Sequence, residues 1–278
     1  MPTAFPALFQ PLRLRHKTLA NRIVFGAHTA NMSEGGLPGE RHRGYYEERA
    51  IGGAAMIVVE PVPVHATAVL TRGNFRHSTD EIIPHFRKVT DAVHAHGTVI
   101  LHQLYHVGQH GDFDNSFMPS WSPSGLPSFH DSDGSHRMSE AEIEEIIEAF
   151  VAAARRARQS GFDGIEIFAA YHALIDQFWT PWSNRRDDRW GGSLENRTRF
   201  SCEIIRRIRR AVGDDFIIGV AVNLHPEIDV SLSIEAMQEI IAWHDLLQRF
   251  RIGGAVIATT GSPASSTPRR GASSNGPA

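Results

Sequence analysis

The chain has 278 residues, of which 41% are hydrophobic, 9% aromatic and 21% charged, a balance that excludes a disordered or fibrous protein. Its 28 basic and 31 acidic residues give a formal charge of −3 without a block of like charge, so neither nucleic acid nor an anionic membrane surface is an expected partner. Because Cys202 is the one cysteine, an internal disulfide and a cysteine-ligated iron–sulfur cluster are excluded.

The sequence shows neither a targeting signal nor a membrane segment. Residues 1–10 lack the basic stretch and apolar core of a signal peptide. The apolar runs all fall short of the roughly 20 residues that span a bilayer. A cytoplasmic location is therefore the expectation.

Six short apolar runs are expected to form strands. Each has 6 or 7 residues, is rich in isoleucine and valine, and lacks polar alternation. This pattern is typical of strands that are buried on both faces of a parallel sheet. In chain order the runs are 22–27, 54–60, 98–104, 164–169, 216–222 and 254–260.

Segments with helical periodicity separate these runs. Ser139 and Glu142 have the spacing of a capping box, and an apolar stripe follows from Ile143 to Ala154. The repeated strand–helix alternation predicts an α/β fold of the TIM (β/α) barrel type. A small hairpin over residues 12–19 is expected to plug the bottom of this barrel. Further helices are expected near 43–50, 82–96, 200–208 and 234–246.

The predicted barrel is incomplete. About six βα units are present by residue 260, whereas a closed barrel needs about eight. We therefore expect one domain over residues 1–260. Residues 261–278 hold no large apolar side chain and are expected to form a disordered tail, which reflects either a truncation or a change of reading frame.

Polar side chains gather where the predicted strands end, which is where barrel enzymes place their catalytic groups. His102, His106 and His110 recur at every fourth residue. They follow a strand and not a helix, so they need not share a face, and a metal site is not expected. The strand ends are residues 27–29, 60, 103–106, 168–172 and 222–223.

The longest motif lies between residues 161 and 200. It contains GFDGIEI at 161–167, QFWTP at 177–181, NRRDDRWGGSLENR at 184–197 and RF at 199–200, and NRIV at 21–24 and QLYHVG at 103–108 precede it. Over residues 5–245 the chain resembles the old yellow enzyme-like NADH:flavin oxidoreductases. Within this motif, Asp188, Glu195 and the arginines are expected to form ion pairs between a loop and a helix.

This resemblance implies that FMN lies across the barrel mouth. The backbone near Ala27, the hydroxyl of Thr29 and the amide of Gln103 are then expected to border the flavin, since an amide both donates and accepts. The alternative for Thr29 is a hydroxyl that caps its own backbone. Glu60, grouped with the cofactor-binding residues, is either a carboxylate at the rim near the substrate or a solvated loop residue.

Three positions after the fourth strand depart from the family's ene-reductases, which carry a His-x-x-His or His-x-x-Asn pair and a proton-donating tyrosine there. They read Phe168, Tyr171 and Ala173. These aromatic residues resemble the amine-oxidising branch, which includes trimethylamine dehydrogenase and the dimethylglycine and stachydrine demethylases. With His28, Phe168 and Tyr171 would bind a methylated ammonium group through ring faces. The alternative is that the two rings only fill the barrel top.

A second departure concerns the flavin itself. The fifth strand in this family ends in an arginine that contacts the flavin, and the matching residue here is Ala221. The resemblance also places a phosphate site in loops after the seventh and eighth strands, which the six units do not include.

The main hypothesis is therefore an FMN-dependent oxidoreductase that demethylates a methylated amine. Hydride passes to flavin N5, with Tyr171 and His172 as the catalytic residues that orient the substrate and manage its proton. One alternative is an ene-reductase that uses NAD(P)H as electron donor. The other is a non-catalytic remnant of the family. The electron acceptor, the particular amine and a homo-oligomeric state stay open.

Overall fold

The computed structural model describes residues 5–76, 79–111, 117–128, 134–222, 232–249 and 255–258. Its centre is a six-stranded sheet in the order β10-β9-β8-β5-β4-β3, and every neighbouring pair is parallel. The strands are β3 (Val24–Phe25), β4 (Met56–Pro63), β5 (Val99–Tyr105), β8 (Gly164–Ala169), β9 (Ile217–Val222) and β10 (Ala255–Ala258).

All six predicted strands are present, each overlapping its apolar run, with β4 continuing to Pro63 and β5 to Tyr105. Every residue of β4, β5 and β9 is buried, as expected for strands that are covered on both faces. The strand β3 is shorter than its apolar run. It lies at one edge of the sheet, where its Val24 side chain is 40% exposed.

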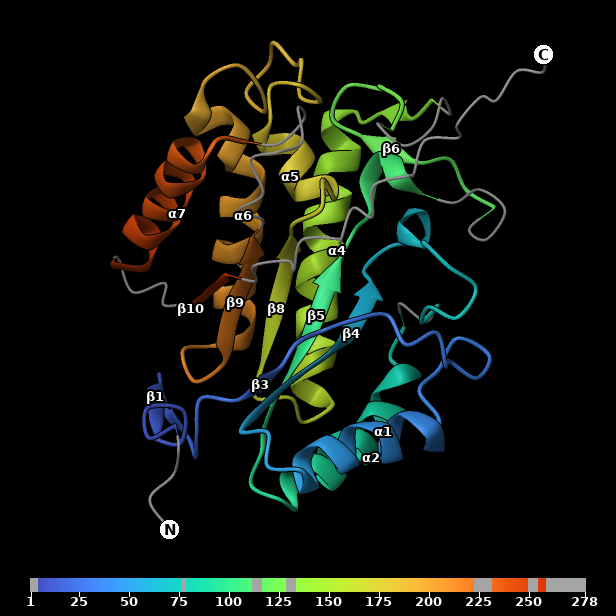
Figure 1. Cartoon of the computed structure of the whole chain (residues 1–278). Helices are drawn as coiled ribbons and strands as arrows, with labels where there is room; N and C mark the ends of the chain where they lie inside the picture. The colour runs from blue at the N-terminus through green and yellow to red at the C-terminus, as the bar shows by residue number, and fades with distance from the viewer. Residues whose placement is uncertain are drawn as a thin grey trace, which may run out of the picture.

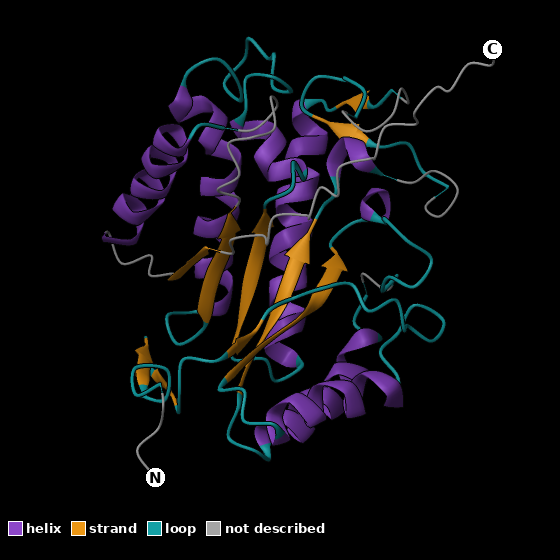
Figure 2. Cartoon of the chain, in the orientation of Figure 1, coloured by secondary structure: helices purple, strands orange, loops and turns teal. Residues whose placement is uncertain are grey.

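Helices cover one face of the sheet (Figures 1 and 2). The main apolar cluster lies between these helices and the outward side chains of the strands, such as Ile100 and Ile165, which are fully buried. Ser139 and Glu142 form the predicted capping box. The helices of this layer are α1 (Glu40–Ile51), α2 (Ile82–His94), α4 (Glu140–Gln159), α6 (Leu194–Val212) and α7 (Ile234–Arg249).

The opposite face of the sheet carries a smaller apolar cluster. Val99 and Leu101 of β5 meet Ile217 of β9 there, and the predicted hairpin closes the cluster from below. This hairpin pairs β1 (Leu12–Leu14) with β2 (Lys17–Leu19) in antiparallel register. Leu19 is 2% exposed within the cluster, so the hairpin does plug the bottom of the barrel.

The sheet is curled but does not close into a barrel over the described residues, with β3 and β10 at its two edges. The predicted incomplete (β/α) barrel is therefore confirmed. An open edge at β3 would be expected to leave Ile23 and Phe25 facing solvent, but Phe25 packs against the helix-side cluster and Val24 is the exposed residue. Asn223 and the predicted tail at 261–278 lie outside the described residues.

Short elements at the carboxyl ends of the strands were not anticipated from the sequence. They include the helix α5 (Leu174–Trp179), which directly follows the loop after β8, and two short 3-10 helices at Ala66–Ala68 and Gly108–His110. The strands β6 (Trp121–Ser122) and β7 (His136–Arg137) pair with each other. Within the described ranges, the helices are too short or too polar to cross a membrane.

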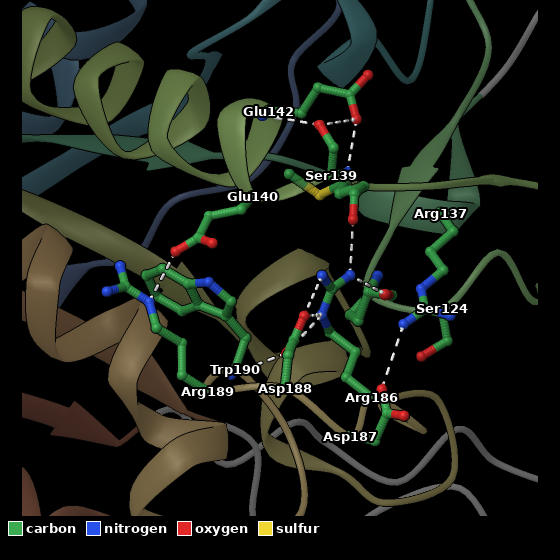
Figure 3. Close-up of polar contacts among 12 residues, drawn as sticks. Ser124, Arg137, Ser139, Glu140, Glu142, Arg186, Asp187, Asp188, Arg189 and Trp190 are labelled. Carbon is green, nitrogen blue, oxygen red and sulfur yellow. Dashed lines mark hydrogen bonds and ion pairs between the residues drawn. The ribbon is translucent and has the colours of Figure 1, made fainter.

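The arginine-rich motif ties this upper layer together (Figure 3). The side chain of Arg186 is 4% exposed and donates to the carbonyl oxygens of Pro123 and Met138 at 2.7 Å each. It also pairs with Asp188 at 2.6 Å. Arg189 reaches Glu140 of α4 at 2.9 Å. Arg189 therefore forms the ion pair between this loop and a helix. The two carboxylates named from the sequence pair elsewhere: Asp188 pairs within the loop, and Glu195 pairs with Arg199 inside α6.

Candidate active site

A pocket of about 380 Å³ opens at the carboxyl ends of β5 and β8. Its apolar walls are Leu70, Val107, Phe168 and Ala173. Its polar groups come from Tyr105, His110, Ser128 and Tyr171. Among the described residues, its lining contains no aspartate, glutamate, lysine or arginine. A pocket of this composition suits an organic ligand with an apolar body.

The backbone is strained where β8 leads into α5. Tyr171 and His172 have φ angles of +52° and +58°, the left-handed region that side chains other than glycine rarely adopt. Two hydrogen bonds hold this turn. The carboxylate of Asp176 accepts from the backbone N–H of His172 at 2.9 Å, and the side-chain amide of Gln177 donates to the backbone carbonyl of His172 at 2.6 Å. Tyr171 is 61% exposed at the pocket, while His172 is 4% exposed.

Phe168 and Tyr171, two predicted substrate-binding residues, lie together at the pocket. Their rings stack with centroids 6.1 Å apart and an interplanar angle of 27°. His172, predicted to be catalytic with Tyr171, does not line the pocket itself. It lies behind His110, with its Nδ1 3.3 Å from Nε2 of His110. Nδ1 of His110 is in turn 2.6 Å from the hydroxyl of Ser128.

Gln103 lies deeper, on the inner face of β5. It is 6% exposed and donates through Nε2 to Oε1 of Glu166 on β8 at 2.7 Å. Its carbonyl oxygen makes no hydrogen bond within the described part of the chain. An amide oxygen in this place is available to the N3–H of a flavin, so the residue fits the cofactor that the sequence suggests.

Thr29 and Ala27 lie on the segment that follows β3. Ala30, the next residue after Thr29, donates its backbone N–H to Glu60 near the end of β4, so the segment crosses the mouth. The hydroxyl of Thr29 is half-buried and, within the described ranges, has no hydrogen-bonding partner. Ala27 packs against the inner cluster. Their place at the mouth is compatible with flavin binding, and that role stays a prediction.

Glu60 is not a solvated loop residue, one of the two alternatives from the sequence. It is 1% exposed and contacts α1, where Oε1 lies 3.0 Å from Nε2 of His42 and accepts from the hydroxyl of Tyr46 at 3.3 Å. The cause is an extra residue in β4 between Val59 and Val62, a bulge that shifts its register against β5. With its oxygens engaged by α1 and by Ala30, the carboxylate holds the mouth segment in place.

His28, the third predicted substrate-binding residue, does not line the pocket. Its Nε2 lies 2.7 Å from the hydroxyl of Tyr45, and its ring meets Phe25 edge-on. Ala221, which stands where the family has an arginine, is 1% exposed and in register with Phe168. A methyl group therefore occupies the place of that cation.

The three regularly spaced histidines have different surroundings. His102 packs among phenylalanine rings, and burial lowers its pKa to about 3. Burial also lowers the pKa of His106 to about 3, and its Nε2 is 2.9 Å from the hydroxyl of Thr67. Of the three, His110 is the one that reaches the pocket. In the described ranges, groups of three or more potential metal ligands are absent.

Four residues of this region have no functional role predicted from the sequence. Two are the carboxyls Glu166 and Asp176, which are 2% and 5% exposed and whose pKa burial raises to about 7 in each case. An acidic residue inside an apolar strand run, as in GIEI, is the signal that points to Glu166. The other two are His110 and Ser128. The regular spacing of His110 suggested only a metal ligand, and the contacts of both residues join segments far apart in the sequence.

The comparison with protein families identifies the family of the chain. Residues 7–271 match the NADH:flavin oxidoreductase / NADH oxidase family. The chain belongs to this family. Its members are FMN-dependent oxidoreductases, so the cofactor expected from the sequence is confirmed at the level of the family, with NAD(P)H as a possible donor. The predicted old yellow enzyme-like resemblance is likewise confirmed.

Curated relatives include proteins named for the oxidation or demethylation of methylated amines and a protein named for NADPH oxidation. The chain is 39% identical over 250 residues to an N,N-dimethylglycine/sarcosine dehydrogenase of Chromohalobacter salexigens, covering 87% of this chain and 35% of that protein. It is 42% identical over 219 residues to a probable N-methylproline demethylase of Rhizobium meliloti, covering 77% and 32%. An NADPH dehydrogenase of Geobacillus is 36% identical over 223 residues, covering 79% and 65%.

Solved structures show the same fold. The old yellow enzyme homologue from Zymomonas mobilis superposes with a TM-score of 0.82 at 27% identity, covering 94% of this chain and 75% of that one. The chain spans about a third of the length of the two amine-oxidising relatives. The activity of the whole relatives therefore comes to this chain only as a proposal.

Proposed function

We propose that this chain forms the flavin-facing and substrate-facing part of an FMN-dependent oxidoreductase that demethylates a methylated amine. The observation that carries the proposal is the pocket at the ends of β5 and β8. Phe168 and Tyr171 stack there, and the described pocket lining holds no charged carboxylate or guanidinium. A methylated ammonium gains about 0.5–2 kcal/mol over a ring face and needs no fixed counter-ion there.

The residues in and behind the pocket have different roles in this proposal. Tyr171 and Phe168 hold the methylated nitrogen against their ring faces. His172 takes up or releases the ammonium proton along a chain of contacts. The hydroxyl of Ser128, which lines the pocket, meets Nδ1 of His110 at 2.6 Å, and Nε2 of His110 lies 3.3 Å from Nδ1 of His172. An imidazole suits this task because it titrates near neutral pH.

Gln103, Thr29 and the backbone near Ala27 would hold the cofactor across the mouth. When bound there, FMN would supply the acceptor for a hydride from the N-methyl carbon, and hydrolysis of the iminium left behind would give formaldehyde and the demethylated amine. The relatives that are named for dimethylglycine, sarcosine and N-methylproline support this substrate class.

An ene-reductase that uses NAD(P)H is the second candidate function. The NADPH dehydrogenase among the relatives favours it. Phe168 and Ala173 argue against it, because neither side chain can donate a hydrogen bond or a proton to the carbonyl of an enone. A non-catalytic form is the third candidate, and the buried methyl group of Ala221 in place of a cation favours that one.

Anaerobic reduction of bound FMN separates these candidates. The purified chain, reconstituted with FMN, is expected to lose its absorbance at roughly 450 nm faster with dimethylglycine or N-methylproline than with NADPH alone. NADPH plus cyclohexenone, which returns the electrons from the flavin to the enone, is expected to give slower turnover than the amine. Faster turnover of the enone would reverse the order of the two enzymes. A protein that stays colourless after reconstitution would support the non-catalytic form.

Two substitutions at Tyr171 separate its ring from its hydroxyl. Tyr171→Leu removes the ring face and is expected to weaken binding of the amine by about tenfold, whereas Tyr171→Phe keeps the face and the affinity.

His172→Ala is expected to slow reduction of the flavin by the amine and to leave the flavin content unchanged. His136→Ala, a histidine whose side chain is 45% exposed, is the matched control. Equal amine affinities of the two Tyr171 variants, or equal reduction rates of His172→Ala and His136→Ala, would contradict the proposed roles.

A further inference from the structure

Gln103 and Glu166 form an isolated polar pair inside the sheet. They are in register on the neighbouring strands β5 and β8, so both side chains project from the same face. The amide nitrogen of Gln103 donates to Oε1 of Glu166 at 2.7 Å, and the two residues are 6% and 2% exposed. Such burial fixes the pair and separates it from bulk water.

Within the described ranges, Glu166 has no cationic partner. On the inner face of β9 its neighbours are Ile217, Gly219 and Ala221, none of which carries a charge. On β5 the titratable neighbour is Tyr105, whose hydroxyl donates to Asn74 at 2.8 Å and whose pKa burial raises, so it stays neutral. Burial, opposed by the hydrogen bond from Gln103, raises the pKa of Glu166 to about 7.

The protonation of Glu166 determines what Gln103 can present. An ionised carboxylate only accepts, so it takes the amide N–H and leaves the amide oxygen of Gln103 toward the mouth. A protonated carboxyl donates its O–H, and the amide accepts that proton best after turning by about 180° about its last torsion, which has two broad minima. The amide then presents its NH₂ group to the mouth.

We propose that Glu166 is a positioning residue for Gln103. When Glu166 takes up a proton, the group that Gln103 presents to the flavin site changes from a hydrogen-bond acceptor to a donor. The switch itself needs only the two residues. Its consequence for cofactor binding rests on the proposed function. The pyrimidine edge of a flavin carries one N–H between two carbonyl oxygens, so the two amide orientations favour different contacts with it.

Nuclear magnetic resonance of the cofactor-free chain tests the switch directly. With glutamine labelled by ¹⁵N and glutamate by ¹³C, the side-chain amide of Gln103 and the carboxyl of Glu166 are expected to shift with one common midpoint near pH 7. Gln103→Leu assigns the amide signal. An amide signal that does not move between about pH 5.5 and 8.5, or two different midpoints in the wild type, would overturn the proposal.

Two matched variants show which carboxyl is responsible. In Glu166→Gln the amide of Gln103 is expected to stop titrating. In Asp176→Asn, which removes the other buried carboxyl with a pKa of about 7, the titration of Gln103 is expected to persist. The opposite pattern would assign the effect to Asp176 and refute the proposal.

Flavin binding then tests the consequence. Quenching of FMN fluorescence by the cofactor-free chain is expected to show about fivefold to tenfold tighter binding at pH 8 than at pH 6, the size of one hydrogen bond. FMN methylated at N3 is expected to lose this pH dependence because it has no N–H to donate. A chain that shows the amide switch but binds no FMN would refute the proposed function and leave the switch established.

Discussion

Two regions of this molecule contain buried ionisable side chains, and the pKa of the carboxyls shifts in opposite directions in the two regions. In the loop before α6, Arg186 donates to two carbonyl groups and pairs with Asp188. Burial alone would raise the pKa of Asp188, but the hydrogen bonds that this carboxylate accepts from Arg186 hold its pKa below the usual value. At the mouth, burial raises the pKa of Glu166 and of Asp176 to about 7. Arg186 and Asp188 are thus paired with each other, whereas Glu166 and Asp176 lie near the pocket without a cationic partner in the described part of the chain.

Removing Arg186 should produce the largest effect. Arg186→Met keeps the apolar stem but leaves the carbonyls of Pro123 and Met138 without donors. We expect it to lower the free energy of unfolding by about 3–4 kcal/mol, with Asp188 contributing less because its side chain is 39% exposed. Urea unfolding measures this loss. A change below about 1 kcal/mol would mean that the loop is not held by this arginine.

Neutralising Asp176 should act in the opposite direction. Its folded-state pKa of about 7 lies above the unfolded value of 3.8, so the folded protein binds more protons between these values and wild-type stability falls as the pH rises through this range. Asp176→Asn should match the wild type at pH 4 and exceed it by on the order of 2–3 kcal/mol at pH 8.

Unfolding in urea across that pH range measures the difference. The asparagine introduced by Asp176→Asn keeps an acceptor oxygen for the N–H of His172, so the turn should survive the substitution. A stability difference that is the same at pH 4 and pH 8 would show that the carboxyl is not strained by burial.

The smallest effect is expected for an exposed arginine in the same loop. Arg189 pairs with Glu140 at 2.9 Å and Glu144 at 3.3 Å, but its side chain is 55% exposed. Arg189→Met should cost less than about 1 kcal/mol because water screens such pairs. A loss as large as that of Arg186→Met would remove the distinction between buried and exposed members of the network.

The sequence predicted the strands and helices of the fold more fully than the candidate active site. Strands such as β8 and β9 are continuous apolar runs because both faces are covered, and this is a local signal. The capping box of α4 is local as well. Family resemblance then placed Phe168 and Tyr171, and the structure stacks their rings at the pocket.

The rest depends on contacts that local patterns do not encode. One inserted residue in β4 turns Glu60 toward α1, and a rule based on strand ends cannot foresee such a bulge. His110 and His172 meet although 62 positions separate them. The raised pKa of Asp176 likewise arises from tertiary burial and not from its neighbours in the chain.

The left-handed turn at Tyr171 and His172 has a consequence for how this protein can be improved. Each bulky residue in that conformation costs roughly 1–2 kcal/mol, a strain that glycine would not carry. Selection for heat resistance alone would therefore be expected to favour glycine at these two positions. The same exchange would remove the aromatic wall of the pocket and the imidazole behind it. Thermostability and activity are thus opposed at this turn, and a stabilised version should draw its gains from the helix side of the sheet.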